Sequence, residues 1–246
     1  MSDIMVHALL LLLMPPLLLG VIVKTKAAFA GRVGAPLLQQ YYDLIKLLRK
    51  GAVLSRTTTW VFIAGPAITA FAVVLAGLIV PLSGKPAPIH FTGDLILFAY
   101  LFALGRFFTA LAALDTGSSF EGMGAAREVT FACLAEPALF LGLLALARVN
   151  GGSGAGEGLS LSAFFGDPVA GAWLTAAPTL VLVVGGLFIV LLVENSRVPF
   201  DDPNTHLELT MIHEVMVLDH SGPPLAMILH GASVKLMLFA VLLAQS

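Results

Sequence analysis

Long apolar runs dominate the hydrophobic pattern of this chain, and each run is long enough to cross a membrane as a helix. A bilayer core about 30 Å thick needs about 20 predominantly apolar residues in helical form. Six stretches meet this requirement, and none has the period-two alternation of a membrane β-barrel. The predicted spans are Ile4–Val23, Trp60–Val80, Leu95–Ala113, Val129–Ala147, Trp173–Val193 and Leu225–Leu243. The pattern predicts an all-α, polytopic membrane helix bundle in which residues 1–246 form a single integral membrane domain.

The connection after the first span contains a shorter helical pattern. Within Ala35–Lys50, Leu37, Tyr41, Leu44 and Leu48 recur at helical spacing, and polar residues occupy the opposite side. This pattern predicts an amphipathic helix in the membrane interface, with basic side chains directed towards anionic headgroups. Two interpretations stay open for it. The helix is either a simple surface anchor or also one wall of a site beneath a docked partner.

Composition narrows the class of protein. Hydrophobic residues make up 58% of the chain and charged residues 11%, whereas soluble domains carry about 25% charged residues. A water-soluble enzyme is therefore excluded. The net charge of −2 provides no field for binding nucleic acid. The only cysteine, Cys133, excludes a disulfide framework and any cysteine-ligated metal or iron–sulfur centre, so we expect no cofactor in this chain.

The basic residues predict the orientation in the membrane. Nine of the 13 lysines and arginines fall in the connections after spans one, three and five, and two fall in the connections on the other side. Because basic residues are enriched on the cytoplasmic side, the cytoplasmic connections should be 24–59, 114–128 and 194–221, with the N-terminus outside. These three connections are expected to form a docking face.

The connection 194–221 is the most polar of the three, with six acidic residues and three histidines. Asp202 and Pro203 are typical of a helix N-cap and first helical position, which predicts a helix over Asn204–Val217. His213 and Glu214 begin the H-E-x-x-H pattern of zinc proteases. Val217 stands at the closing position, so no metal is expected.

The connection 114–128 combines glycines with charged residues. Gly117, Gly122 and Gly124 permit tight turns, and four charged residues are more than a passive hairpin requires. The sequence therefore predicts an irregular loop that contributes to docking.

Three charged residues, Arg106, Glu136 and Lys235, lie well inside predicted spans. Ionisable groups at such depth are costly, and they usually pair with one another or line a wet path. Two interpretations stay open: an interhelical salt bridge between Arg106 and Glu136, or a proton route. Asp94 and Glu194 lie at span ends, where we expect interfacial bystanders.

Several segments together resemble one membrane-subunit family. ENSRVPFDDPNTHLELTMIHEVMVLDHSG, residues 194–222, resembles a cytoplasmic loop of the membrane subunit that respiratory complex I shares with membrane-bound nickel–iron hydrogenases. Residues 31–50 are similar to the first interfacial helix of this family. LDTGSSFEGMGAARE and the following LAEPALF match its third loop and fourth span.

The details of the resemblance favour one branch. Residues 205–214 look like the hydrogenase-4 and formate hydrogenlyase side of the family. Asn204 and His206 occupy positions where the quinone enzymes would carry acids, so quinone binding is not carried over. The family generally has eight membrane helices, and the six predicted here are two fewer.

The resemblance implies a multi-pass component of a prokaryotic inner-membrane oxidoreductase complex that docks a peripheral arm and links redox chemistry to proton or sodium translocation. The implied partners are hydrogenase large and small subunits, an iron–sulfur protein, antiporter-like membrane subunits and the lipid bilayer, with no nucleic acid. Nickel–iron and iron–sulfur centres would lie in those partners. The alternatives are the corresponding membrane subunit of NADH–quinone oxidoreductase proper, with a quinone cavity, or a stand-alone ion channel or transporter.

Two sets of residues are predicted to carry these roles. The buried ion relay or gate comprises Arg106, Glu136 and Lys235. The junction with the peripheral arm comprises Arg32, Asp115, Arg127, Glu128, Glu194, Arg197, Asp201, Asp202, Glu208, His213 and Glu214.

Overall fold

A computed structural model describes residues 2–82, 86–149, 160–164, 171, 173–174, 176–201 and 211–246, and all regular structure in these ranges is helical. Six helices are long and apolar enough to cross a membrane. They are α1 (Ser2–Phe29), α3 (Trp60–Ile79), α4 (Asp94–Asp115), α5 (Ser119–Val149), α8 (Ala177–Glu194) and α10 (Gly222–Gln245). The predicted all-α membrane bundle with six spans is confirmed.

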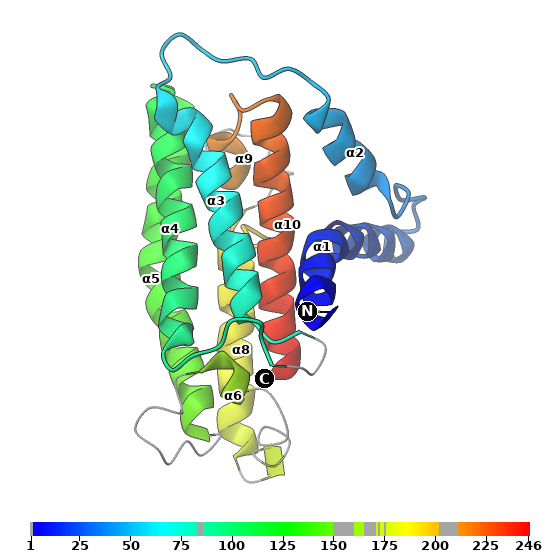
Figure 1. The fold of residues 1–246 in the computed structure, drawn as a ribbon, viewed down its shortest axis with the longest axis vertical. Helices are drawn as coiled ribbons and strands as arrows, with labels where there is room; N and C mark the ends of the chain where they lie inside the picture. Colours follow the sequence, from blue (N-terminus) through cyan, green and yellow to red (C-terminus); the bar gives the residue numbers. More distant parts are fainter. Residues whose placement is uncertain are drawn as a thin grey trace.

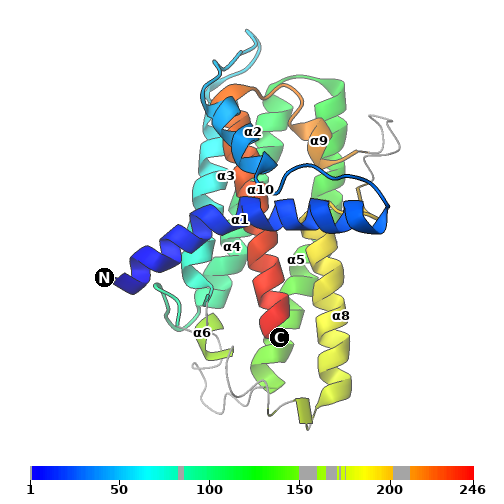
Figure 2. The same cartoon turned by 90° about the vertical axis from the view of Figure 1, so that its right-hand side faces the viewer.

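Five of the long helices run alongside one another, and the sixth crosses them. Figure 1 shows α3, α4, α5, α8 and α10 aligned along the long axis of the molecule. Figure 2 shows α1 lying across this bundle at a steep angle. The apolar core joins residues of all six helices, and Leu11 places α1 in it.

Helix α1 is longer than its predicted span. It continues through Pro15 and Pro16 and ends at Phe29, six residues beyond Val23, and it changes direction part-way along (Figure 2). Lys24 and Lys26 therefore belong to the last turns of α1, not to the connection that follows. Long basic side chains can extend from such turns towards the membrane surface.

The predicted amphipathic helix is present as α2 (Gln39–Leu48). None of its residues is buried, and it lies beside α1 and α10 (Figure 2). The hydroxyl of Tyr41 donates to the carbonyl oxygen of Leu13, which ties α2 to the middle of α1.

The predicted irregular loop over 114–128 is wrong. Helix α4 ends at Asp115 and α5 begins at Ser119, so the connection is only three residues long. Gly117 provides the turn with φ of 72°, and Gly122 and Gly124 are ordinary helical residues. Gly124 serves packing instead, because a Cβ atom there would lie 3.0 Å from the carbonyl oxygen of Ile212.

The continuous helix predicted over Asn204–Val217 is also wrong in its described part. Residues 202–210 lie outside the described residues, and residues 211 and 212 are not helical. Only the short helix α9 (His213–Met216) forms in the described part of this segment. The Asp201 carboxylate accepts hydrogen bonds from the backbone N–H groups of Ile212 (3.2 Å) and His213 (3.1 Å). This tertiary contact gives the two N–H groups the acceptor that a continuous helix would otherwise provide.

The expectation that Asp94 is an interfacial bystander is wrong. The residue is 0% exposed. Its carboxylate accepts hydrogen bonds from the N–H of Leu161 (2.7 Å), the hydroxyl of Ser160 (2.9 Å) and the N–H of Phe91 (3.3 Å). Asp94 thereby fixes the short helix α6 (Leu161–Phe164) against the start of α4.

Candidate ion-relay site and adjoining cavity

Arg106 on α4 is the centre of a buried group of charges. Its Nε atom lies 3.2 Å from Glu128 Oε1 and its Nη1 atom 2.5 Å from Glu136 Oε1, both on α5. Its Nη2 atom pairs with Glu194 at the end of α8. A planar guanidinium presents donors in several directions, which allows one arginine to join three carboxylates. The predicted contact between Arg106 and Glu136 is confirmed.

Lys235 on α10 completes the group. Its Nζ atom lies 2.8 Å from Glu194 Oε2 and 5.7 Å from the centre of the Phe102 ring. We call these five residues, Arg106, Glu128, Glu136, Glu194 and Lys235, the charge cluster. With three carboxylates and two cations, the charge cluster has a formal charge of −1. Its five residues come from four different helices.

Burial differs sharply across the charge cluster. The side chain of Glu194 is 1% exposed, so the expectation of an interfacial bystander is wrong for this residue too. The side chain of Glu136, in contrast, is 41% exposed. Glu136 does not line the internal cavity described next, and nearby residues Val129 and Phe107 are exposed on the outside of the bundle. The cluster therefore runs from the interior, at Glu194, to the outer surface of α4 and α5, at Glu136.

A cavity of about 610 Å³ adjoins the interior end of the charge cluster. Arg106, Glu128, Glu194 and Lys235 form part of its wall. The cavity extends to Ile22 and Lys26 of α1 and to Gln40 of α2, so the amphipathic helix contributes one residue to its lining.

His213 and Arg197 line the same cavity from the connection between α8 and α10. Burial lowers the pKa of His213, against the opposing influence of Glu128. Its Nε2 atom is buried and has no hydrogen-bond partner among the described residues. Burial also lowers the pKa of Arg197, for which no ion pair is found in the described part of the chain. Both side chains present polar atoms that a ligand or water in the cavity could satisfy.

The remaining predicted junction residues have several different placements. Glu128 and Glu194 belong to the charge cluster. Asp115 accepts hydrogen bonds from the N–H (2.6 Å) and hydroxyl (2.8 Å) of Thr59, which fixes the start of α3 to the end of α4. Arg127 donates to the carbonyl oxygen of Met211 at 3.4 Å.

The other predicted junction residues differ in their exposure. Arg32 and Glu214 are exposed, and Asp201 is buried as described above; Asp201 and Glu214 both line the cavity. Asp202 and Glu208 lie outside the described residues. Among the residues that the structure describes, no group of three or more histidine, cysteine, aspartate or glutamate side chains is placed to hold a metal ion.

Sequence reasoning missed three residues beside the charge cluster. The ring of Phe102 faces Lys235, and a cation over an aromatic face is attracted by the ring quadrupole. The hydroxyls of Thr69 and Thr109 both donate to the carbonyl oxygen of Gly105, at 2.9 and 3.0 Å, next to Arg106 in the chain. Uncharged residues within apolar spans give no composition signal that could have identified them.

The fold and the site define a polytopic membrane protein whose bundle contains a buried ionic network beside a polar connection. Residues 2–245 match the family model described as NADH dehydrogenase, and the chain belongs to this family.

Relatives and solved structures agree with this assignment. Formate hydrogenlyase subunit 4 of Escherichia coli (strain K12) is 32% identical over 231 residues, covering 94% of this chain and 72% of that protein. Hydrogenase-4 component C of the same organism is 32% identical over 236 residues, covering 96% and 71%. A chain in the structure of the membrane-bound sulfane sulfur reductase, an archaeal respiratory membrane complex, has the same fold, with a TM-score of 0.76, 21% identity, and 97% and 77% coverage.

Proposed function

We propose that this chain is the membrane anchor and ion-coupling component of an oxidoreductase complex of the hydrogenase-4 and formate hydrogenlyase type. It docks a peripheral arm that carries nickel–iron and iron–sulfur centres, formed by hydrogenase large and small subunits and an iron–sulfur protein. It links redox chemistry in that arm to proton or sodium translocation with antiporter-like membrane subunits. The segments 24–59, 114–128 and 194–221, which include the helix ends next to each connection, face the cytoplasm, and the N-terminus lies outside.

The charge cluster carries this proposal. It begins at the cavity beneath the connection 194–221 and ends at Glu136, which lies on the outer surface near the middle of a 30-residue span. Ionisable groups at this depth commonly mark ion pathways and proton relays. Because Arg106 joins three carboxylates, a proton or a change of partner at one carboxylate alters the field at the other two.

The exposed side of Glu136 supports contact with a neighbouring membrane protein. At about 1.5 Å per residue, Glu136 lies roughly 18 Å along α5 from Arg148. A carboxylate that faces lipid at such depth costs several kcal/mol. A partner helix with a polar group against Glu136 removes that cost, and it provides the route by which an ion leaves this chain.

Purification of the tagged chain from native membranes in mild detergent tests the assembly. We expect hydrogenase large and small subunits and an iron–sulfur protein to co-isolate with it. A stand-alone channel or transporter would instead be recovered as a homo-oligomer that moves ions in vesicles without other subunits. That result would overturn the proposal.

Glu136→Gln tests the coupling role in the assembled complex. The amide keeps the shape and a hydrogen-bond acceptor, yet it cannot exchange a proton. We expect co-isolation of the complex at normal yield and loss of ion uptake by inverted vesicles during turnover. The matched control is Asp43→Asn on α2, whose carboxylate accepts from Gln39 in the same helix at 3.0 Å. Loss of assembly in Glu136→Gln alone would show that the pair with Arg106 is purely structural.

A second candidate function is favoured by the cavity itself. A volume of about 610 Å³ with a largely apolar wall and the unpartnered Nε2 atom of His213 suits a ligand with a polar ring and a hydrocarbon tail. In that case the chain belongs to an NADH–quinone oxidoreductase and its cavity takes a quinone. Quinone reduction by the purified complex distinguishes the two functions, because a hydrogenase-type complex turns over without quinone.

A further inference from the structure

The basic residues of this chain are concentrated in the segment that leads from the end of α1 through α2 to the start of α3 (Figure 1). Residues 24–59 contain seven of the 13 lysines and arginines and a single acid, Asp43, which gives a formal charge of +6. The remaining residues contain six basic and 14 acidic residues, a formal charge of −8, which together give the net −2. This part of the molecule therefore attracts anions, although the chain as a whole is acidic.

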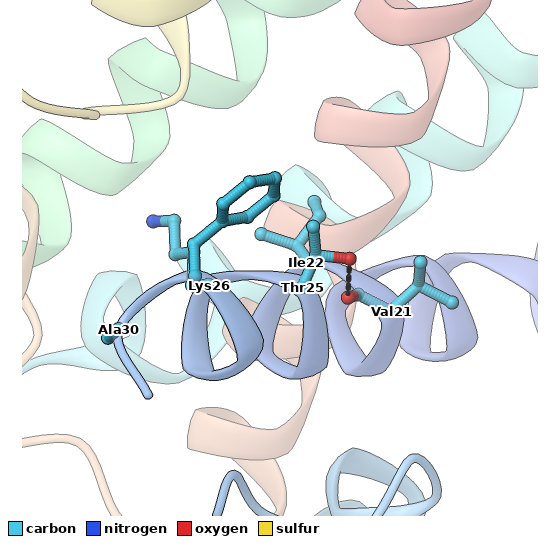
Figure 3. Close-up of a pocket in the computed structure, with 6 residues that line it drawn as sticks. Val21, Ile22, Thr25, Lys26 and Ala30 are labelled. Atoms are coloured by element: carbon cyan, nitrogen blue, oxygen red, sulfur yellow. Dashed lines mark hydrogen bonds between the residues drawn. The ribbon is translucent and has the colours of Figure 1, made fainter. Parts of the chain in front are cut away.

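A groove of about 560 Å³ lies along the last turns of α1, where this basic segment begins. Val21, Ile22, Phe29 and Ala30 make most of its lining apolar, and Thr25 and Lys26 complete it. Figure 3 shows Thr25 turned back towards Val21, where its hydroxyl donates to the carbonyl oxygen at 2.9 Å. The hydroxyl is thus already used within the helix.

Lys26 is the charged group that this groove offers to a ligand. The neighbouring Lys24 donates from Nζ to the carbonyl oxygen of Gly34 at 3.2 Å, which folds the connection back on α1. Lys26 is exposed, and the described part of the chain provides no hydrogen bond or ion pair to its ammonium. The groove therefore combines a hydrocarbon-like wall with one available cation.

The side chains around the groove are apolar and exposed, so they need a hydrocarbon environment. Phe29 is 91% exposed and Val33 is 100% exposed, and α2 exposes further apolar side chains, among them Ile45 and Leu48. Exposed apolar side chains in a segment rich in lysines and arginines are typical of contact with the boundary between headgroups and acyl chains.

We propose that this groove binds an anionic phospholipid. An acyl chain lies along Val21, Ile22 and Phe29, and the phosphate is held by Lys26 and by the field of the basic segment 24–59. A phospholipid supplies both an anionic phosphate for Lys26 and hydrocarbon for the exposed Phe29 and Val33.

The bound lipid also affects the internal cavity. Ile22 and Lys26 line both this groove and the cavity that reaches the charge cluster. A lipid that fixes these two side chains in the groove thereby fixes part of the cavity wall. Anionic lipid is accordingly a structural component of the site as well as its surroundings.

Photo-crosslinking of the intact complex in nanodiscs tests the proposal. The probe is phosphatidylglycerol with a diazirine on its acyl chain, and mass spectrometry maps labelled peptides. We expect labelling of residues 21–30 by this probe to exceed labelling by the matching phosphatidylcholine probe. Lys26→Gln should reduce labelling by phosphatidylglycerol about fivefold, as expected for one basic residue at an anionic membrane surface. Arg148→Gln, near the far end of α5, is the matched control and should leave it unchanged.

Three results would overturn the proposal: equal labelling by both lipids, unchanged labelling in Lys26→Gln, or no labelling of this peptide by either lipid. The last result would mean that a protein covers the groove. The comparison of the two lipids uses the unaltered complex, so it is informative even if the variant assembles poorly. Co-isolation of partner subunits is scored separately, and failure of lipid binding leaves the proposed function intact.

Discussion

Asp94 and Glu194 are two carboxylates buried in the same helix bundle, and they are satisfied in different ways. Asp94 accepts from two backbone N–H groups and one hydroxyl, all close to the first residues of α4 and α6. Glu194 pairs with the side chains of Arg106 and Lys235, which come from two other helices. Backbone donors stay where the fold puts them, whereas long cationic side chains can change partners. The first arrangement suits a fixed joint, and the second suits a site that changes state.

The largest expected effect comes from Glu194→Ala. The substitution leaves Lys235 without its carboxylate partner and removes one of the three carboxylates that pair with Arg106. Two buried cations therefore lose negative charge that balances them. Breaking a buried pair in this way costs about 3–5 kcal/mol of unfolding free energy. Thermal unfolding of the purified complex measures the loss. The double variant Glu194→Ala, Lys235→Met should recover part of it, and simple additivity of the two changes would contradict the pairing.

Asp94→Ala should have a smaller effect of a different kind. It leaves the N–H of Leu161 and the hydroxyl of Ser160 without their acceptor, at a cost of about 1–3 kcal/mol. Ion uptake per turnover should stay unchanged, because no member of the charge cluster is touched. Asp94→Asn, which keeps one acceptor oxygen, is the control and should lose less stability. A loss of ion uptake in Asp94→Ala would remove the distinction between the two carboxylates.

The smallest expected effect is the pH dependence that His213 introduces. Burial lowers the pKa of His213 below its ordinary value of 6.5. Below pH 6.5 the unfolded chain therefore binds a proton at this residue before the folded chain does. Stability is therefore fully present above pH 6.5 and falls as the pH drops from there to the lowered folded pKa. The slope within this window is about 1.4 kcal/mol per pH unit.

Unfolding measured over this pH range in wild type and in His213→Asn isolates the contribution of His213. The variant should lose the part of the slope that His213 contributes, since asparagine does not titrate. His220, whose pKa is likewise lowered by burial, lies beside Phe62 and should continue to titrate in both proteins. An unchanged slope in His213→Asn would assign the pH dependence to His220 instead.

The spans could be predicted from sequence because length and hydropathy are local properties, and the structure differs mainly at their ends. The role of Glu194 could not, because 88 residues separate it from Arg106 and only the packing of α4, α8 and α10 brings them together. The same holds for the loop over 114–128, where glycines suggested turns. Gly124 is instead required by the approach of the Ile212 carbonyl oxygen from a distant segment.

The start of α10 has a mechanical consequence. The hydroxyl of Ser221 accepts from the N–H of Val53 at 2.9 Å, and a Cβ atom on Gly222 would lie 2.8 Å from the carbonyl oxygen of Gly51. Lys235 follows on the same helix, roughly 20 Å further along its axis. A helix resists stretching, so any force applied to the segment around Gly51 is transmitted along α10 to the contact between Lys235 and Glu194. The helix thus acts as a rigid rod between a surface that a partner can reach and a charge that it cannot.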